Sequence, residues 1–299
     1  MINVTNIERF ATHDGDGIRS VIFLAGCPLR CPWCANPETW TMSRKLFYTK
    51  TKCVGCRLCE QHCPNKAIHF VNDEFQHDPA LCSECETCVQ HCLKDALQFS
   101  GKGMEIDDIM EEVLKDRDYY EESGGGITIS GGEPFVQFEG LMSILKACRQ
   151  ENITTAVETT GQYDQEKLKE ALPYIDTFLF DIKHLDARKL KKVTNGDLDV
   201  ILSNAAFISQ SNAHKLVIRV PVIPGFNYEK ETLEAIIQLA ASLKAREINL
   251  LPYHTLGKSK YDKMGKEYPM GGTSMVSKKD LEPYLALQDV YPIRIRIGG

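Results

Sequence analysis

Three cysteines near the start of the chain have an unusual number and spacing. Cys27, Cys31 and Cys34 form a C-x3-C-x2-C pattern, and Trp33 immediately precedes the last of them. A structural zinc site uses four ligands and a disulfide framework uses pairs, although three thiols plus a distant histidine remain an alternative. Three thiolates on a cluster of four irons would leave one iron open, as catalytic metal centres do. The spacing therefore favours a metal centre with one open coordination position.

Eight more cysteines form two runs with the same spacing, C-x2-C-x2-C-x3-C, at residues 53–63 and 82–92. Bacterial two-cluster ferredoxins have this spacing, and in them the fourth cysteine of each run ligates the other cluster. A pair of zinc knuckles is the alternative, but zinc sites usually combine two short C-x2-C pairs from separate places. We therefore predict two further [4Fe–4S] clusters. Their ligands would be Cys53, Cys56, Cys59 and Cys92 for one, and Cys82, Cys85, Cys88 and Cys63 for the other.

Three further residues bear on this assignment. Pro64 follows the first run, as in ferredoxins, whereas Leu93 takes the place of proline after the second run. Cys148 follows Leu141 and Leu145 at helical spacing, so we expect it in the hydrophobic core.

The bulk composition excludes several classes of function. The chain has 299 residues, 43% of them hydrophobic, and a net charge of −6, so no basic face predicts nucleic acid as a partner. No apolar run approaches the ~18 residues that span a bilayer, and the N-terminus lacks the apolar core of a signal peptide. Twelve cysteines without a secretion signal favour a reducing compartment. We therefore expect a cytoplasmic protein that does not bind a membrane.

The elements that must position these cysteines alternate between strand-like and helix-like patterns. Six β/α units of this kind predict a parallel sheet, either open and doubly wound or a partial barrel, because a complete barrel has eight. Residues 291–297 are a candidate for a late extra strand. An amphipathic helix is expected from residue 106 to 114. The predicted strands are 20–26, 127–130, 154–159, 177–183, 215–223 and 247–253, and the predicted helices are 136–149, 164–172, 186–209 and 229–244.

Two short motifs follow predicted strands. In SGGEP, at residues 130–134, the two glycines would let the backbone approach a ligand closely, although a simple turn is the alternative. In FDIK, Asp181 and Lys183 are two residues apart on a strand and so face the same way. The two residues could form a buried salt bridge with a purely structural role. Alternatively, Lys183 could contact a ligand.

The C-x3-C-x-aromatic-C spacing resembles the signature of the radical S-adenosylmethionine (SAM) superfamily, with Trp33 in the aromatic place. The resemblance implies that the amino and carboxylate groups of SAM chelate the open iron. It also implies that an electron from the cluster breaks a carbon–sulfur bond of SAM, which gives a 5′-deoxyadenosyl radical. Together with the two clusters predicted for the insertion, this gives three [4Fe–4S] clusters and SAM as expected cofactors.

Motifs along nearly the whole chain resemble more closely the activating enzymes of glycyl radical enzymes, of which pyruvate formate-lyase activase is the best known. The resemblance implies an α/β fold in which residues 1–47 and 101–299 form a partial (β/α)6 TIM-like barrel of the radical SAM type. Residues 48–100 would be an inserted bacterial ferredoxin-like domain. The matching motifs are THDGDGIRSVIFLAGCPLRCPWCANPETW, GGGITISGGEP, ETTG, FDIK, IRVPVIPGFN and LLPYHTLGKSKY.

The resemblance also assigns roles to single residues. Gly131, Gly132 and Glu133 would hold the SAM amino group, and Lys183 would meet its carboxylate. A monovalent cation is implied near Asp181 and Glu158, where the short formate-lyase activase has an aspartate instead of Glu158. The D-G-x-G-x-R element is expected to form a tight turn and to take no part in catalysis; it comprises Asp14, Gly15, Gly17 and Arg19. The complete implied SAM site is Trp33, Cys34, Ala35, Gly131, Gly132, Glu133, Asp181, Ile182, Lys183 and His254.

The activity implied is the removal of one hydrogen from a glycine Cα of a partner glycyl radical enzyme. Reduced flavodoxin or ferredoxin would supply the electron, and the two clusters of the insertion would either relay it or support docking. Two other functions are possible from the residues alone. One is a radical SAM enzyme acting on a small molecule or peptide, but all eight cysteines of the insertion are used as cluster ligands, which leaves no open iron there. The other is an electron carrier, which leaves the three-cysteine motif unexplained.

Overall fold

Nine strands form one sheet in the order β13-β12-β11-β10-β9-β8-β2-β1-β7. From β2 to β13 every neighbouring pair is parallel, and the strands follow one another in chain order. A doubly wound sheet would reverse its order at a switch point, so this order confirms the partial barrel. The strands are β1 (Ile2–Ala11), β2 (Arg19–Leu24), β7 (Lys102–Met104), β8 (Gly126–Gly131), β9 (Thr154–Thr159), β10 (Thr177–Asp181), β11 (Leu216–Val222), β12 (Glu247–Pro252) and β13 (Arg294–Ile297).

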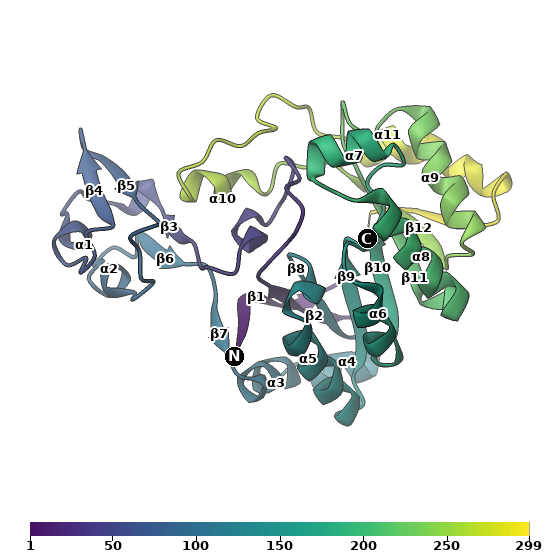
Figure 1. Ribbon diagram of the computed structural model, residues 1–299, viewed down its shortest axis with the longest axis horizontal. Helices are drawn as coiled ribbons and strands as arrows, with labels where there is room; N and C mark the ends of the chain where they lie inside the picture. Colours follow the sequence, from purple (N-terminus) through teal and green to yellow (C-terminus); the bar gives the residue numbers. More distant parts are fainter. Residues whose placement is uncertain (299) are drawn as a thin grey trace.

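The structure, a computed structural model, describes residues 1–298. Helices connect the successive parallel strands and cover the sheet (Figure 1). No helix in this part of the chain is long and apolar enough to span a membrane. The helices of the barrel are α3 (Ile106–Leu114), α4 (Arg117–Ser123), α5 (Phe138–Gln150), α6 (Gln165–Ala171), α7 (Ala187–Thr194), α8 (Leu198–Asn212), α9 (Lys230–Ser242), α10 (Lys258–Lys263) and α11 (Lys278–Leu281).

The single helix predicted over residues 186–209 is wrong, because the chain breaks there into α7 and α8. Asn195 adopts a left-handed conformation with φ of 66° and ends α7. The side chain of Asp197 then accepts a hydrogen bond from the Val200 amide and begins α8. Asparagine tolerates this conformation, and aspartate is a favoured helix N-cap, so the N-G-D sequence specifies a helix end followed by a helix start.

The parallel strands are buried on both faces. Val21 and Ile22 are adjacent and point to opposite faces of β2, yet neither has any exposed surface. The same holds for Ile127 and Ile129 of β8 together with the intervening Thr128. Such strands are apolar throughout rather than alternating, because the helices cover one face and the barrel interior lies on the other.

The strand β1 was not predicted from the sequence. It pairs antiparallel with β2 on one side and with β7 on the other, so it lies at the start of the parallel arc. Its apolar residues Ile2 and Val4 are buried, but the strand continues into polar residues whose side chains are exposed. An antiparallel strand with one solvated face has such a half-polar composition. It therefore lacks the long apolar run by which the parallel strands were predicted.

The cysteine-dense segment forms a small unit beside the barrel (Figure 1). It has its own core, which contains Leu46, Ile68, Leu97 and Phe99 together with two of the cysteines. The barrel helix α10 packs against β3 of this unit. Its elements are β3 (Leu46–Tyr48), α1 (Leu58–Gln61), β4 (Ile68–Val71), β5 (Glu74–His77), α2 (Thr87–Gln90) and β6 (Leu97–Phe99), with β3 paired to β6 and β4 to β5.

A buried chain of hydrogen bonds joins α4 to β2. The Tyr120 hydroxyl lies 2.6 Å from Ser20 Oγ and 2.8 Å from the Val113 carbonyl oxygen, and Ser20 Oγ in turn donates to Asp116 at 2.7 Å. Asp116 is also paired with Arg9. All of these groups except Arg9 are buried, so each polar atom depends on its partner in the chain.

We predict that Tyr120→Phe destabilises the barrel by about 1–2 kcal/mol, because Ser20 and the Val113 carbonyl then lose a buried partner. Tyr119→Phe is the matched control, since its side chain is 44% exposed and lies next in the chain. Anaerobic urea unfolding measures both. Equal midpoints for the two variants would show that the buried chain of hydrogen bonds does not contribute.

Candidate active site

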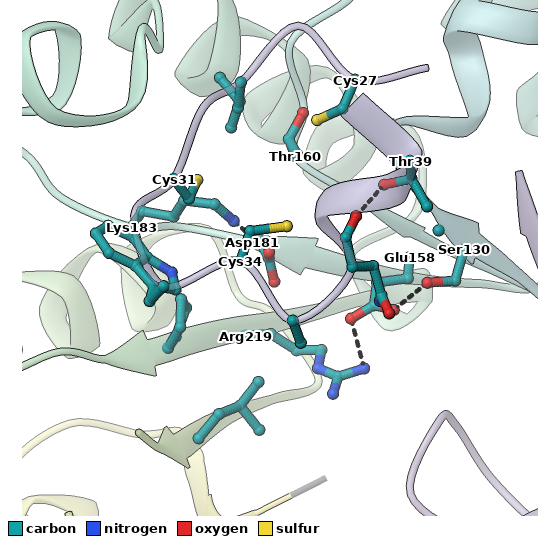
Figure 2. A pocket seen from close by; sticks show the side chains of 18 of the residues that line it. Cys27, Cys31, Cys34, Thr39, Ser130, Glu158, Thr160, Asp181, Lys183 and Arg219 are labelled. Atoms are coloured by element: carbon teal, nitrogen blue, oxygen red, sulfur yellow. Dashed lines mark hydrogen bonds and ion pairs between the residues drawn. The ribbon is translucent and has the colours of Figure 1, made fainter. Parts of the chain in front are cut away.

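A cavity opens at the carboxyl ends of the parallel strands (Figure 2). Its walls come from the three-cysteine loop after β2 and from the ends of β8, β9, β10, β11 and β12. Active sites of α/β barrels lie at this end of the strands. The cavity is lined by all but two of the residues predicted for the three-cysteine loop and the SAM site: Cys27, Cys31, Trp33, Cys34, Ala35, Gly131, Gly132, Asp181, Lys183 and His254.

The three thiols are held close to the cavity by a loop that leaves β2. Cys31 is buried, and the Cys34 amide donates to the Cys31 carbonyl at 3.1 Å, which turns the chain between them. Burial raises the pKa of Cys27 to about 12 and also raises the pKa values of Cys31 and Cys34. Buried thiols of this kind become ligands only when a metal stabilises the thiolate, so the three cysteines fit a cluster-bound site.

The glycines of the SGGEP motif bring the end of β8 against the cysteine loop. A Cβ on Gly132 would lie 2.1 Å from the carbonyl oxygen of Gly26, and one on Gly131 would lie 2.4 Å from the Leu24 nitrogen. The Glu133 amide donates to the Gly26 carbonyl at 2.7 Å. Only glycine permits this approach, so the motif holds the cysteine loop in place. The backbone of the two glycines also lines the cavity.

Glu133 itself lies behind the cavity wall and is not one of its lining residues. Its carboxylate is completely buried and accepts hydrogen bonds from the Thr159 hydroxyl at 2.9 Å and from the Thr160 amide and hydroxyl at 2.8 and 2.6 Å. Burial raises the pKa of Glu133 to about 7, although these donors oppose the shift. In this structure the glutamate therefore joins the ends of β8 and β9.

Lys183 and Asp181 form an ion pair at the cavity wall, as Figure 2 shows. Their side chains are 8% and 18% exposed, so the pair is largely shielded from water. Burial lowers the pKa of Lys183, but the Asp181 carboxylate and the neighbouring cysteines raise it by more, and the net shift is upward. The amine therefore remains a cation that could meet an anionic ligand group in the cavity.

Arg219 of β11 is a site residue that the sequence reasoning missed. Its Nη1 atom lies 3.1 Å from Glu158 Oε1 and 3.7 Å from Asp14 Oδ1, and Glu158 also accepts from Ser130. The Arg219 Nε atom is buried and lacks a hydrogen-bond partner among the described residues. A single arginine within the apolar strand LVIRVPV was the available signal, because a charge there requires a buried partner.

The remaining predicted residues lie at the rim of the cavity or behind its wall. Trp33 packs on Phe226 with ring centroids 4.8 Å apart, and His254 is exposed at the rim. Ile182 is buried in the core, and its amide donates to the Arg219 carbonyl at 2.9 Å. Its side chain is therefore not available to a ligand in this cavity.

The D-G-x-G-x-R element has a structural role at Arg19. The guanidinium is buried and donates to Thr128 Oγ1 at 2.7 Å and to the Ile127 carbonyl at 2.6 Å. A Cβ on Gly17 would lie 2.4 Å from the nitrogen of Gly125. These contacts tie the entry of β2 to β8. Asp14 differs from the rest of the element, because it lies near Arg219 in the site.

The insertion contains two further cavities, each surrounded by four cysteines. One is lined by Cys53, Cys56, Cys59 and Cys92, and the other by Cys63, Cys82, Cys85 and Cys88. The fourth cysteine of each run therefore lies with the first three of the other run. Among residues 1–298, no three His, Cys, Asp or Glu side chains are placed to hold a single metal ion.

Comparison with known proteins identifies the family of the chain. The model of the Radical SAM superfamily matches residues 21–239. A trans-4-hydroxy-L-proline dehydratase activating enzyme of Clostridioides difficile is 39% identical over 299 residues, which cover 99% of each chain. A choline trimethylamine-lyase activating enzyme of Oleidesulfovibrio alaskensis is 36% identical and covers 93% of this chain and 92% of its own. A 4-hydroxyphenylacetate decarboxylase activating enzyme of Clostridioides difficile is 37% identical, with coverages of 96% and 92%.

A solved structure supports the fold independently. The Streptococcus suis protein SuiB bound to S-adenosylmethionine superimposes with a TM-score of 0.51 at 18% identity, over 66% of this chain and 44% of its own. The superfamily implies a [4Fe–4S] cluster and SAM, and the cavity presents the three thiols that such a cluster needs. The chain therefore belongs to the radical SAM superfamily and, within it, to the activating enzymes of glycyl radical enzymes.

Proposed function

We propose that this enzyme removes one hydrogen atom from a glycine Cα of a partner glycyl radical enzyme, with the chemistry at the three-cysteine cavity. The observation that carries the proposal is the convergence of Cys27, Cys31 and Cys34 on one cavity with the Lys183–Asp181 pair. When bound there, the cluster and SAM would supply the reducing electron and the hydrogen acceptor. The products would be 5′-deoxyadenosine, which would carry the abstracted hydrogen, and methionine.

The chain's own residues would hold SAM by charge and by shape. Lys183 is the buried cation that would meet the SAM carboxylate, because a charge-assisted contact is strong where water is excluded. The backbone at Gly131 and Gly132 would face the amino group, and Trp33 and Ala35 would contact the adenine. A monovalent cation near Asp181 and Glu158 would have to compete with Lys183 and Arg219, which already pair with those carboxylates.

We further propose that residues 48–100 form a unit that holds two [4Fe–4S] clusters. The exchange of the fourth cysteine between the two lined cavities supports this, because it is the arrangement of two-cluster ferredoxins. In each case the four cysteines surround a cavity rather than a point, which suits a cluster better than a zinc ion. Reduced flavodoxin or ferredoxin would supply the electron through these clusters.

The experiment that tests the function compares Cys34→Ala with Cys148→Ala. Cys148 is completely buried among core residues, so its loss tests for general damage. With dithionite and SAM, Cys34→Ala should form no 5′-deoxyadenosine but keep about eight of about 12 irons. Cys148→Ala should keep all of its iron and cleave SAM. Cleavage by Cys34→Ala would place the reaction at another centre.

Glu133→Gln should destabilise the protein by about 1–3 kcal/mol, because the amide NH2 group can only donate and would face the Thr159 and Thr160 donors that a carboxyl oxygen accepts. Because the folded-state pKa of Glu133 is raised from 4.5 to about 7, its contribution is full at low pH and falls as pH rises through 7. The difference between wild type and variant should therefore be larger at pH 6 than at pH 8.

Anaerobic urea unfolding at the two pH values measures this difference, with the exposed Glu139→Gln as control. A difference that grows from pH 6 to pH 8 would contradict the assignment.

A further inference from the structure

The two cysteine runs of the insertion carry opposite charge. Residues 50–66 contain four basic residues and one acidic residue, whereas residues 78–95 contain four acidic residues and one basic residue. The runs are otherwise related by the same cysteine spacing, the same helical turn and the same pairing of strands. Their charge therefore distinguishes two sides of a nearly symmetric unit.

The acidic run is bound by Arg44, which lies in the segment that leads from the barrel into the insertion. Arg44 donates to the Glu84 carboxylate at 3.1 Å and to the Glu84 carbonyl at 2.6 Å, and it also pairs with Glu86. Its guanidinium lies 4.8 Å from the Phe99 ring. Arg44 follows the three-cysteine loop by ten residues. The centre at Cys82, Cys85 and Cys88 is thus the one fastened to the barrel side.

The first turn of the basic run, in contrast, is open to solvent and lies beside residues 93–94 at the end of the acidic run. Val54 and Leu93 are 64% and 81% exposed, and they line one cavity with Cys53, Cys56 and Cys92. Arg57 and Lys94 line the same cavity, and Lys52 precedes Cys53. Of these, Arg57 is paired with the exposed Asp73. We name this surface, made of Lys52, Val54, Arg57, Leu93 and Lys94, the Val54–Leu93 face.

The Val54–Leu93 face lies beside α1, which Figure 1 shows at the outer end of the insertion together with the β4–β5 hairpin. Exposed aliphatic side chains next to cations are typical of a binding surface for a partner of opposite charge. Leu93 stands where ferredoxins have proline, and in this position it cannot contribute to the core.

We propose that the Val54–Leu93 face binds an acidic flavodoxin and that the electron enters the enzyme there. This inference rests on the proposed function. The flavin ring of a flavodoxin exposes an apolar edge, which matches Val54 and Leu93, and an acidic rim matches Lys52 and Lys94. One electron passes from the reduced flavin to the adjacent cluster, so the flavin is oxidised by one electron and the cluster is reduced by one electron. No bond is made or broken. The centre fastened by Arg44 then lies between this entry point and the barrel.

The test measures the rate at which reduced flavodoxin bleaches the cluster absorbance in anaerobic stopped flow, and the affinity of oxidised flavodoxin from quenching of flavin fluorescence. Lys52→Glu/Lys94→Glu should lower the second-order rate and the affinity at least tenfold at low salt. Lys66→Glu, an exposed lysine of the other centre's loop, should change each less than twofold. Leu93→Ala should weaken binding, whereas Leu81→Ala, beside Cys82, should not.

Dithionite provides the control for the proposed function, because it needs no docking surface. All of these variants should cleave SAM at the wild-type rate with dithionite and keep the wild-type iron content. Loss of dithionite-driven cleavage in the wild type would overturn the proposed function instead. Unchanged flavodoxin rates in both Lys52→Glu/Lys94→Glu and Leu93→Ala would overturn the docking face. Faster reduction by an acidic ferredoxin with the same charge dependence would overturn flavodoxin as the occupant.

Discussion

The carboxylate of Glu133 is the interaction on which the site depends. It accepts hydrogen bonds from Thr159 and Thr160 at the end of β9, while its own amide donates to Gly26 in the cysteine loop. A completely buried carboxylate is costly unless such donors surround it, so the ends of β8 and β9 and the loop are held in one arrangement. The three thiols consequently face a cavity whose shape is set before any ligand enters.

The cavity contains two ion pairs whose charged groups are available to interact with a charged ligand. Lys183 is balanced by Asp181 and Arg219 by Glu158, and both cations are nearly inaccessible to water. Charges in such surroundings interact more strongly than they do at a surface. Glu158 and Asp181 lie near the carboxyl ends of β9 and β10, Lys183 follows β10, and Arg219 lies in the middle of β11. The parallel order of these three strands is what brings the four side chains together.

The sequence was most informative where one residue type repeats at fixed steps. Cysteine spacing located all three groups of thiols, and apolar runs located the parallel strands. It was least informative where an element is half polar or a role depends on distant partners, as for β1 and Arg219. The role of Glu133 could not be read either, because its donors Thr159 and Thr160 are 26 and 27 residues away in the chain. Its place behind the cavity wall follows from packing alone.

The most direct measurement of the central claim follows one hydrogen atom. Reduced enzyme, SAM and a glycyl radical enzyme deuterated at the glycine Cα would be mixed, and the 5′-deoxyadenosine and the electron paramagnetic resonance signal analysed. The account predicts one deuterium in each 5′-deoxyadenosine formed, and a radical on the partner whose doublet, present with the protiated glycine, collapses to a singlet. A radical formed without transfer of deuterium to 5′-deoxyadenosine would contradict it.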